Sequence, residues 1–242
     1  MASPLPVHQP TQASRVDETA SEILRRPISR LGTSIYVELQ KAPLGDLERA
    51  IKRCVDVLLS TLALAALCPL FAVIALLIRL NSPGRVIFSQ RRNGFNDRRF
   101  RILKFRTMTV EEDDASVIQA TRGDRRVTRV GAVLRHLSLD ELPQLINVLR
   151  GEMSLIGPRP HAVAHDEQYS RKVANYAFRY RVKPGITGWA QVNGLRGETP
   201  NAETMQQRVN FDLWYIQNWS IWLDLSILAR TVIALLAPRN AH

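Results

Sequence analysis

The sequence predicts an α+β fold in which an apolar membrane helix precedes a mostly helical domain that contains a small β-hairpin. Three observations predict this arrangement. Residues 57–78 form an apolar run without a charged side chain. Residues 85–106 hold an Asn-Gly turn signal between stretches rich in β-branched and aromatic residues. Residues 128–150 and 214–237 carry apolar side chains at helical spacing.

The N-terminal part of the sequence does not read as a targeting segment. Residues 1–46 are polar, lack a continuous apolar core, and contain Pro4, Pro6, Pro10, Pro27 and Pro43. Such a composition cannot bury enough apolar surface to fold alone. We therefore expect a disordered-looking, mobile tail, with a short helix around residues 17–26.

The apolar run is long enough to cross a membrane, since as a helix it would measure about 33 Å against a bilayer core of about 30 Å. Basic residues flank both of its ends: Arg49, Lys52 and Arg53 precede it, and Arg79, Arg85, Arg91 and Arg92 follow it. The positive-inside rule then places both ends on the cytoplasmic side. Pro69 near the middle supplies a break, so residues 47–82 are predicted to form a re-entrant helix-break-helix. A kinked spanning helix is the alternative.

One acidic residue, Asp56, lies just inside the basic flank of this helix. At headgroup depth it would pair with Lys52 or Arg53 on the same helix face. Its predicted role is therefore to anchor the helix at the membrane surface.

Charge and cysteine content narrow the class of protein. The formal net charge of +11 and a sequence pI near 10.4 indicate a partner rich in negative charge: nucleic acid, an anionic membrane surface or phosphorylated substrates. The two cysteines, Cys54 and Cys68, lie in or beside the apolar run. That position argues against a disulfide framework and favours a reducing compartment.

The first elements after the membrane helix are a hairpin and a polar stretch. Residues 85–90 and 100–106 are predicted to pair around Asn93-Gly94 as a short, strongly basic hairpin. Residues 110–126 are polar and charged without a clear period. We expect a surface loop or a short helix there.

The segment SLDELPQLINVLRG at residues 138–151 carries the chemistry. Pro143 fits the first turn of a helix and Gly151 fits its C-terminal stop. Asp140 and Glu141 then project at the helix N-terminus. The spacing from Ser138 to Glu141 is also that of a capping box, which alone would mark only the start of a helix.

Three features favour a reactive site over a simple helix start. Two adjacent carboxylates at a positive helix end can seat a divalent cation such as Mg²⁺ and a nucleophile that approaches a phosphate. The chain is held at a membrane, where a lipid phosphate lies within reach. Arginines that could neutralise a pyrophosphate surround the pair in sequence: Arg129, Arg135, Arg150 and Arg159.

A carboxylate can displace a phosphoryl group when the leaving group is stabilised, which forms an acyl phosphate that a second acceptor resolves. Two turn-rich stretches, residues 157–160 and 183–194, are expected as ordered loops that hold backbone donors and guanidinium groups near an anion, with Arg159 and Arg196 beside them. Residues 214–237 are predicted as an interfacial amphipathic helix, with a core helix of the domain as the alternative.

Four blocks in order resemble one known family: KRCVDVLLS at 52–60, KFRTM at 104–108, residues 128–160 through GPRP, and RVKPGITGWAQVNGLRGET at 181–199. The sequence resembles the bacterial sugar transferases, also called monotopic polyprenyl-phosphate phosphoglycosyl transferases, from about Glu48 to Ala237. The resemblance implies a re-entrant helix broken at Pro69. The sequence departs from the family at Cys68, where a serine is common. Many relatives carry several N-terminal membrane helices, whereas we expect only a disordered-looking tail here, so the sequence resembles the compact catalytic unit.

The resemblance also implies the roles of individual residues. Asp140 is the expected nucleophile, which attacks the β-phosphate of a UDP-sugar. Glu141 is expected to assist by orienting the lipid phosphate or Mg²⁺, which the pair would hold. The expected substrate-binding residues are Arg135 and Arg159 for phosphate, with Lys104, Arg106, Lys183 and Arg196 on the nucleotide-sugar side.

The implied reaction is transfer of a hexose-1-phosphate from a UDP-sugar to undecaprenyl phosphate, with release of UMP, to start an exopolysaccharide. The block at 185–199 and the residues after it look most like glucose-transferring members; galactose is the alternative, because Leu195 stands where glucose-type members often carry an aromatic. Residues 83–242 would be a cytoplasmic, membrane-associated catalytic domain at the bacterial inner membrane. The sequence leaves monomer or homodimer open.

Two other classes of function compete with this interpretation. The basic residues 85–106 interleave with Phe95, Phe100 and Phe105 as in nucleic-acid platforms. The uncharged membrane segment argues against a nucleic-acid partner. A non-catalytic membrane scaffold is the second rival, and it predicts that Asp140 is dispensable.

Overall fold

The computed structural model describes residues 28–31, 34–37, 44–109, 124–197 and 201–236, and the chain divides into two units, residues 1–42 and 43–242. In the first unit, strands β1 (Ile28–Leu31) and β2 (Ser34–Val37) pair antiparallel, which the sequence analysis did not predict. The helix expected at residues 17–26 lies outside the described residues. The mobile tail stays a prediction.

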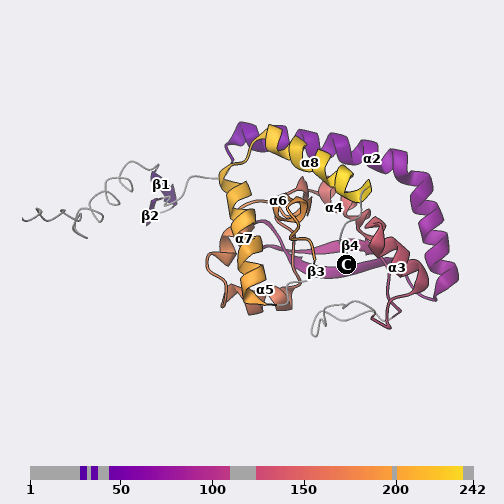
Figure 1. The fold of residues 1–242 in the computed structure, drawn as a ribbon. Coiled ribbons are helices and arrows are strands. Elements are labelled where there is room, and N and C mark those ends of the chain that lie inside the picture. Colours follow the sequence, from indigo (N-terminus) through magenta and orange to yellow (C-terminus); the bar gives the residue numbers. More distant parts are fainter. Residues whose placement is uncertain (1–27, 32–33, 38–43, 110–123, 198–200, 237–242) are drawn as a thin grey trace, which may run out of the picture. The chain divides into compact units, whose positions relative to one another are not determined.

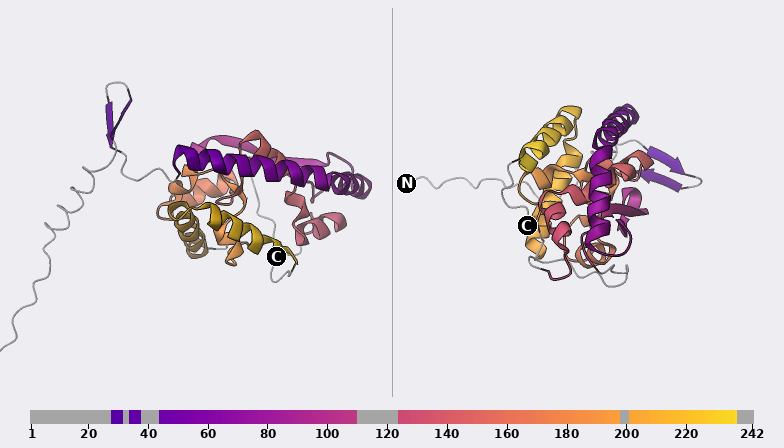
Figure 2. Two further views of the ribbon diagram at one scale, coloured as in Figure 1. Left: turned by 90° about the horizontal axis from the view of Figure 1, so that it is seen from above. Right: turned by 90° about the vertical axis from the view of Figure 1, so that its right-hand side faces the viewer.

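Helix α2 (Asp46–Asn81) holds the whole apolar run, with Pro69 inside it. Figure 1 shows that α2 runs beside α8 and then turns sharply toward α3, and the views of Figure 2 agree. A proline removes one backbone donor and its ring clashes with the preceding turn, so Pro69 accounts for the change of direction. The predicted break therefore takes the form of a bend within one helix.

Both arms of α2 pack against the rest of the second unit, to which the helix itself belongs. Leu59 and Leu64 of the first arm contact the main hydrophobic core, which includes Val148, Met153 and Ile227. The second arm contributes Ile74 and Ile78, both 2% exposed, to a cluster with Phe105 and Leu134. The helix thus wraps one domain with both of its arms.

Asp56 corrects one expectation. Its carboxylate is buried and accepts hydrogen bonds from Ser154 Oγ at 3.1 Å and from the backbone N–H of Leu155 at 3.0 Å. Lys52 instead donates to Asp224 on α8 at 2.5 Å. The expected ion pair within the helix is wrong because Asp56 faces the domain, where buried backbone and hydroxyl donors satisfy it.

The predicted hairpin is confirmed. Strands β3 (Ile87–Asn93) and β4 (Arg99–Phe105) pair antiparallel with Ile87 opposite Phe105, and the connection begins at Gly94 and includes a 3₁₀ turn, η1 (Phe95–Asp97). Of the predicted loop or helix at 110–126, residues 110–123 lie outside the described residues.

The helical pattern at 128–150 is divided into three pieces. They are α3 (Arg129–His136), the 3₁₀ turn η2 (Leu139–Glu141) and α4 (Gln144–Arg150). Ser138, at φ 58°, ends the first piece, and Pro143 stands before the last, one residue outside its predicted position. Gly151 ends α4 at φ 80°, as predicted.

Short strands and helices follow α4 along the chain. After β5 (Ser154–Ile156) come α5 (Val163–Ser170) and the 3₁₀ segment η3 (Tyr176–Arg181). Strand β6 (Gly185–Thr187) pairs parallel with β5, within a stretch expected to be loop, and the short α6 (Trp189–Val192) follows.

The C-terminal segment forms two helices, α7 (Ala202–Gln217) and α8 (Ile221–Leu236), instead of the single helix expected from residue 214 onward. Residues 218–220 separate them. Ser220 Oγ accepts a hydrogen bond from the N–H of Leu223 in the first turn of α8. This side-chain acceptor satisfies a donor that a continuous helix would have bonded internally, so a new helix starts there.

Among the described residues, α2 is the one helix long and apolar enough to cross a membrane, and only 11% of its apolar window is buried within the protein. Buried helices of soluble domains do not leave such a run uncovered. Large apolar side chains are exposed on α2 and α8, among them Leu58, Leu62, Leu76, Leu80, Trp222, Val232 and Ile233. The domain therefore presents an apolar surface of the kind that lipid covers.

Candidate active site

Asp140 and Glu141 lie in η2, between α3 and α4, and each is 8% exposed. Ser138 precedes them in the left-handed region, so its side chain caps no helix. Its hydroxyl accepts a hydrogen bond from Arg196 instead. The capping-box interpretation is wrong, and the two carboxylates are turned toward the basic interior.

Glu141 is held by two cations. Arg159 makes a two-point contact with it, at 2.5 Å to Oε1 and 3.0 Å to Oε2, and Lys104 Nζ donates to Oε1 at 2.8 Å. Burial alone would raise the pKa of Glu141, but Arg159 and Lys104 hold it well below its usual value. Glu141 is therefore a fixed, ionised carboxylate whose oxygens are both engaged.

Asp140 differs from its neighbour, because its carboxylate accepts no hydrogen bond from any residue in the described part of the chain. Burial raises the pKa of Asp140, and the charge of Glu141 raises it further, while Lys104, Arg159 and Arg135 act in the opposite direction. A carboxylate without hydrogen-bond partners, close to three cations, keeps its lone pairs available for a phosphorus centre.

The other predicted residues fall into two groups. The structure brings Arg135, Arg159 and Lys104 to the carboxylates, and Arg196 to the adjacent Ser138. Arg135 donates through Nε to Thr107 at 2.8 Å, and burial lowers the pKa of its guanidinium.

Two predicted residues are placed elsewhere. Arg106 is buried and donates to the carbonyl oxygens of Ser82 and Pro83, where it ties β4 to the end of α2. Lys183 lies beside Gly151 and Arg53, and burial together with Arg53 lowers the pKa of its ammonium group. These contacts tie each of the two to the framework of the domain, and their substrate-binding role stays a prediction.

The residues present fit a metal ion only in part. No group of three or more His, Cys, Asp or Glu side chains in the described residues could hold a metal by itself. Both Glu141 oxygens are bonded to cations, whereas Asp140 is free. Mg²⁺ is commonly held by one or two carboxylates plus substrate phosphates, and Asp140 fits that use.

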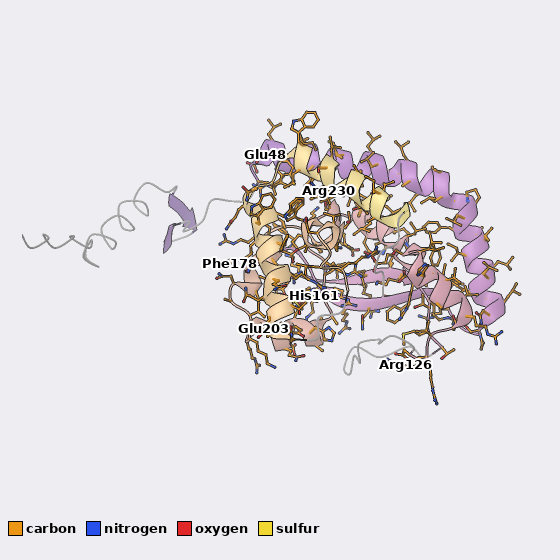
Figure 3. The ribbon with its side chains drawn as sticks, viewed as in Figure 1. Glu48, Arg126, His161, Phe178, Glu203 and Arg230 are labelled. Atoms are coloured by element: carbon orange, nitrogen blue, oxygen red, sulfur yellow. The ribbon has the colours of Figure 1, made fainter. Side chains whose placement is uncertain are left out.

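A buried polar network behind the site was not anticipated from the sequence. His161 Nδ1 lies 2.6 Å from Tyr176 Oη, which donates to Asp166 at 2.6 Å. Arg179 Nε donates to Asp212 at 2.8 Å, and its NH2 donates to the backbone oxygen of Arg159 at 2.7 Å. Figure 3 labels His161 in the interior, between α7 and the hairpin. The network holds the backbone of Arg159 in place through the hydrogen bond from Arg179.

Comparison with known proteins bears on the same region. The model of the bacterial sugar transferase family matches residues 47–238, which include α2, the carboxylate pair and both C-terminal helices. The chain belongs to the bacterial sugar transferase family. The four sequence blocks that suggested this resemblance all lie inside the match.

Relatives of this bacterial sugar transferase share about half of its residues. It is 51% identical over 210 residues, 87% of the chain, to a UDP-glucose:undecaprenyl-phosphate glucose-1-phosphate transferase of Escherichia coli, of which it covers 45%. A protein of the same description from Caulobacter vibrioides is 55% identical over 216 residues, 88% of the chain and 80% of the relative. The exopolysaccharide production protein ExoY of Rhizobium meliloti is 40% identical over 215 residues, 83% of the chain and 90% of the relative. The chain thus spans less than half of some relatives.

Proposed function

We propose that this bacterial sugar transferase moves glucose-1-phosphate from UDP-glucose to undecaprenyl phosphate and releases UMP, as the first step of exopolysaccharide repeat-unit assembly. The observation that carries the proposal is the buried, unbonded carboxylate of Asp140 among Lys104, Arg135 and Arg159. Relatives at about 50% identity that are described as glucose-1-phosphate transferases support the sugar and the acceptor. Galactose is the alternative sugar.

In the proposed reaction, an Asp140 oxygen forms a bond to the β-phosphorus, and the bond from that phosphorus to the bridging oxygen breaks. The electron pair stays on the bridging oxygen, which leaves with UMP. An oxygen of undecaprenyl phosphate then attacks the same phosphorus and returns the Asp140 carboxylate. Arg159 and Lys104, fixed by Glu141, neutralise charge on the phosphoryl oxygens.

Mg²⁺, where bound, would be held by Asp140 and by phosphate oxygens of the substrate, and it would add positive charge at the pyrophosphate. Glu141 is a weaker candidate as a ligand, because Arg159 and Lys104 occupy its oxygens. Its proposed part is to position those two cations.

We also propose that α2 is re-entrant and that the domain lies on the cytoplasmic face of the inner membrane. Both arms of α2 pack on one domain, which supports entry and exit on the same side. A straight spanning helix would carry one end about 30 Å away, across the bilayer. The basic residues on both flanks favour the cytoplasmic side.

The reaction is tested with detergent-solubilised protein, undecaprenyl phosphate, Mg²⁺ and a panel of UDP-sugars, with UMP as the readout. We expect UMP release with UDP-glucose and none after Asp140→Asn. Release only with UDP-galactose would assign the alternative sugar, and absence of release with every sugar would refute the reaction. Unchanged UMP release by Asp140→Asn would refute Asp140 as the nucleophile. The non-catalytic scaffold predicts instead that no UDP-sugar yields UMP and that Asp140→Asn leaves exopolysaccharide production in cells unchanged.

The covalent step has its own test. Brief incubation with UDP-glucose labelled in the β-phosphate, without lipid acceptor, should leave label on a peptide that contains Asp140. Lipid product that accumulates while no adduct forms on that aspartate would contradict the two-step route.

The topology is tested with single cysteines in a background of Cys54→Ser and Cys68→Ser. Leu47→Cys and Leu80→Cys lie near the two ends of α2, and both leucines are exposed. A re-entrant helix predicts that an impermeant thiol reagent labels both in inverted membrane vesicles and neither in intact spheroplasts. Opposite labelling of the two ends would show a spanning helix.

A further inference from the structure

Arg208 on α7 is a buried arginine without a carboxylate partner among the described residues. It is 5% exposed. Its NH2 donates to the backbone oxygen of Gly197 at 2.6 Å, and its Nε is buried without a hydrogen-bond partner. Burial lowers the pKa of this guanidinium to about 10, so the group is still charged at neutral pH.

The carboxylate beside Arg208 and the Glu141 carboxylate of the reactive pair are both engaged with other cations. Asp212, one helical turn further along α7, accepts from Arg179 at 2.8 Å. Glu141 is held by Arg159 and Lys104. Buried charges in proteins are usually paired, because a lone ion loses its hydration without compensation. A guanidinium left over inside a basic cluster therefore indicates that an anion from outside the chain completes it.

The neighbours of Arg208 hold its side chain in a defined direction. His161 Nδ1 lies 2.6 Å from Tyr176 Oη and 3.0 Å from Arg179 NH1, so these two neighbours fix the orientation of the ring. Arg208 NH1 faces the other ring nitrogen, Nε2, at 3.4 Å. Burial and the surrounding arginines keep the pKa of His161 well below its usual value, so it presents no competing charge.

Arg208 is linked to the reactive pair through Arg159. The charge of Arg159 is close enough to lower the pKa of Arg208 and to interact with Asp140 as well. Arg159 thus neighbours both Asp140 and Arg208, and a diphosphate, with its two phosphates, is the class of ligand that would span these two positions. Among these arginines, Arg159 is already paired with Glu141 and Arg179 with Asp212.

We propose that Arg208 is a substrate-binding residue that contacts the α-phosphate of the nucleotide sugar, the phosphate that departs as UMP. This inference rests on the proposed function and adds the residue that receives the leaving group. When the bond between the β-phosphorus and the bridging oxygen breaks, the electron pair remains on the oxygen of UMP. The guanidinium of Arg208 neutralises the charge that develops there.

The test compares Arg208→Gln and Arg208→Lys with Arg171→Gln, a control at an exposed arginine just after α5. The probe is UMP. Loss of a charged hydrogen bond should raise the inhibition constant of UMP about 10- to 100-fold in Arg208→Gln, with a smaller rise in Arg208→Lys and none in the control. The KM for UDP-glucose should rise as well, while the KM for undecaprenyl phosphate stays unchanged.

Thermal unfolding separates binding from a structural role. If Arg208 serves the ligand, Arg208→Gln removes an unpaired buried charge, so the ligand-free protein should melt at the same or a higher temperature, and the upward shift caused by UMP should shrink. A lower melting temperature without ligand, together with an unchanged UMP shift, would overturn the inference. If wild-type protein releases no UMP from any UDP-sugar, the proposed function fails; UMP or pyrophosphate that stabilises wild-type but not Arg208→Gln would still support the anion site.

Discussion

The two adjacent carboxylates are chemically unlike although they share one turn of backbone. Glu141 is bonded by Arg159 and Lys104, whereas Asp140 is bonded by neither. The pKa of Glu141 is accordingly held low by its cations, and that of Asp140 is raised chiefly by burial. Glu141 therefore belongs to the framework of the site, whereas the ionised form of Asp140 is disfavoured by burial and is not stabilised by hydrogen bonds from that framework.

This asymmetry predicts opposite effects on stability. Asp140→Asn removes a carboxylate whose ionised form is disfavoured by burial, so its melting temperature should equal or exceed that of the wild type while UMP release is lost. Glu141→Gln leaves Arg159 and Lys104 without their counter-ion and should cost about 3 kcal/mol. Calorimetry in detergent at neutral pH measures both. Glu167→Gln, at an exposed residue of α5, is the control that should change neither quantity, and a destabilised Asp140→Asn would contradict the assignment.

His161 predicts a pH dependence of stability. Burial, with Arg179 and Arg208, holds its folded pKa well below the 6.5 of a free histidine. As the pH falls through 6.5 toward the folded pKa, the unfolded chain binds a proton that the folded protein does not, so stability falls. His161→Gln should reduce that loss of stability between pH 7.5 and 5.5 by about 1.4 kcal/mol, which is the linkage free energy of one pH unit below 6.5. Identical slopes for wild type and variant would contradict the burial of a neutral imidazole.

Part of the site was predictable from residue spacing, and part was not. Asp140, Glu141, Arg135 and Arg159 lie within one short stretch of chain, so local pattern was enough to group them. Arg208 sits in a segment that carries no turn signal or charge cluster. Its proposed place in the site depends on the packing of α7 on η3, a contact that sequence spacing does not reveal.

At the scale of elements, the parallel pair β5 and β6 fixes where the loop with Arg159 begins. A Cβ added to Gly185 would lie 2.1 Å from the backbone nitrogen of Gly157, and one added to Gly157 would lie 2.4 Å from the Lys183 oxygen. Both clashes involve backbone atoms, which cannot rotate away. The close approach of the two strands therefore requires glycine at both positions.

Gly185→Ala should force these strands apart and move Arg159 away from Glu141. We expect a loss of about 3 kcal/mol of stability, as for an overpacked core, and a loss of most UMP release. Thermal unfolding and the UMP assay measure the two effects. Gly45→Ala is the matched control, because its Cβ would meet only the Glu48 side chain at 3.6 Å. Equal stability of Gly185→Ala and the control would show that the strands are not so tightly apposed.

Elements with strong local signals were predicted, and those set by packing were not. The Asn-Gly signal predicted the β3–β4 hairpin, whereas the break predicted at Pro69 is a bend inside one continuous helix, α2. The break between α7 and α8 was missed although Asn218 and Ser220 are common at helix ends, because the apolar period continues across it. The β5–β6 pair was missed because each strand is only three residues long and depends on a partner far along the chain.

At the scale of the whole molecule, attachment to the membrane should be apolar more than electrostatic. Most of the apolar window of α2 is not covered by protein, so lipid contact is needed to keep it from water. We expect the protein to stay with the membrane pellet in about 1 M NaCl, where charge attraction is screened beyond about 3 Å, and to need detergent for release. Release by salt alone would show that the net charge of +11 is the main attachment.

Composition predicted that the protein associates with a membrane, but it did not predict which face of α2 packs against the domain. The uncharged run at residues 57–78 and the net positive charge indicated a membrane protein with an anionic partner. Composition did not indicate that Lys52, Arg53 and Asp56, placed by the sequence at the lipid headgroups, face the domain and bind Asp224, the α4 carbonyl oxygens and Ser154. Which face of a helix is covered depends on tertiary packing.

The contacts of Arg53 connect helix α2 to the part of the chain that carries Asp140. Arg53 donates to the carbonyl oxygens of Val148 and Leu149 in the last turn of α4, at 2.5 and 2.8 Å, and α4 continues directly from the turn that bears Asp140. In the proposed reaction the acceptor is a phosphate that its lipid tail confines to one plane. In the proposed re-entrant arrangement, the same helix that enters the leaflet also fixes the height of the attacking oxygen above it. An added residue in α2 after Arg53 would turn the rest of that helix by about 100° and carry the nucleophile out of its plane.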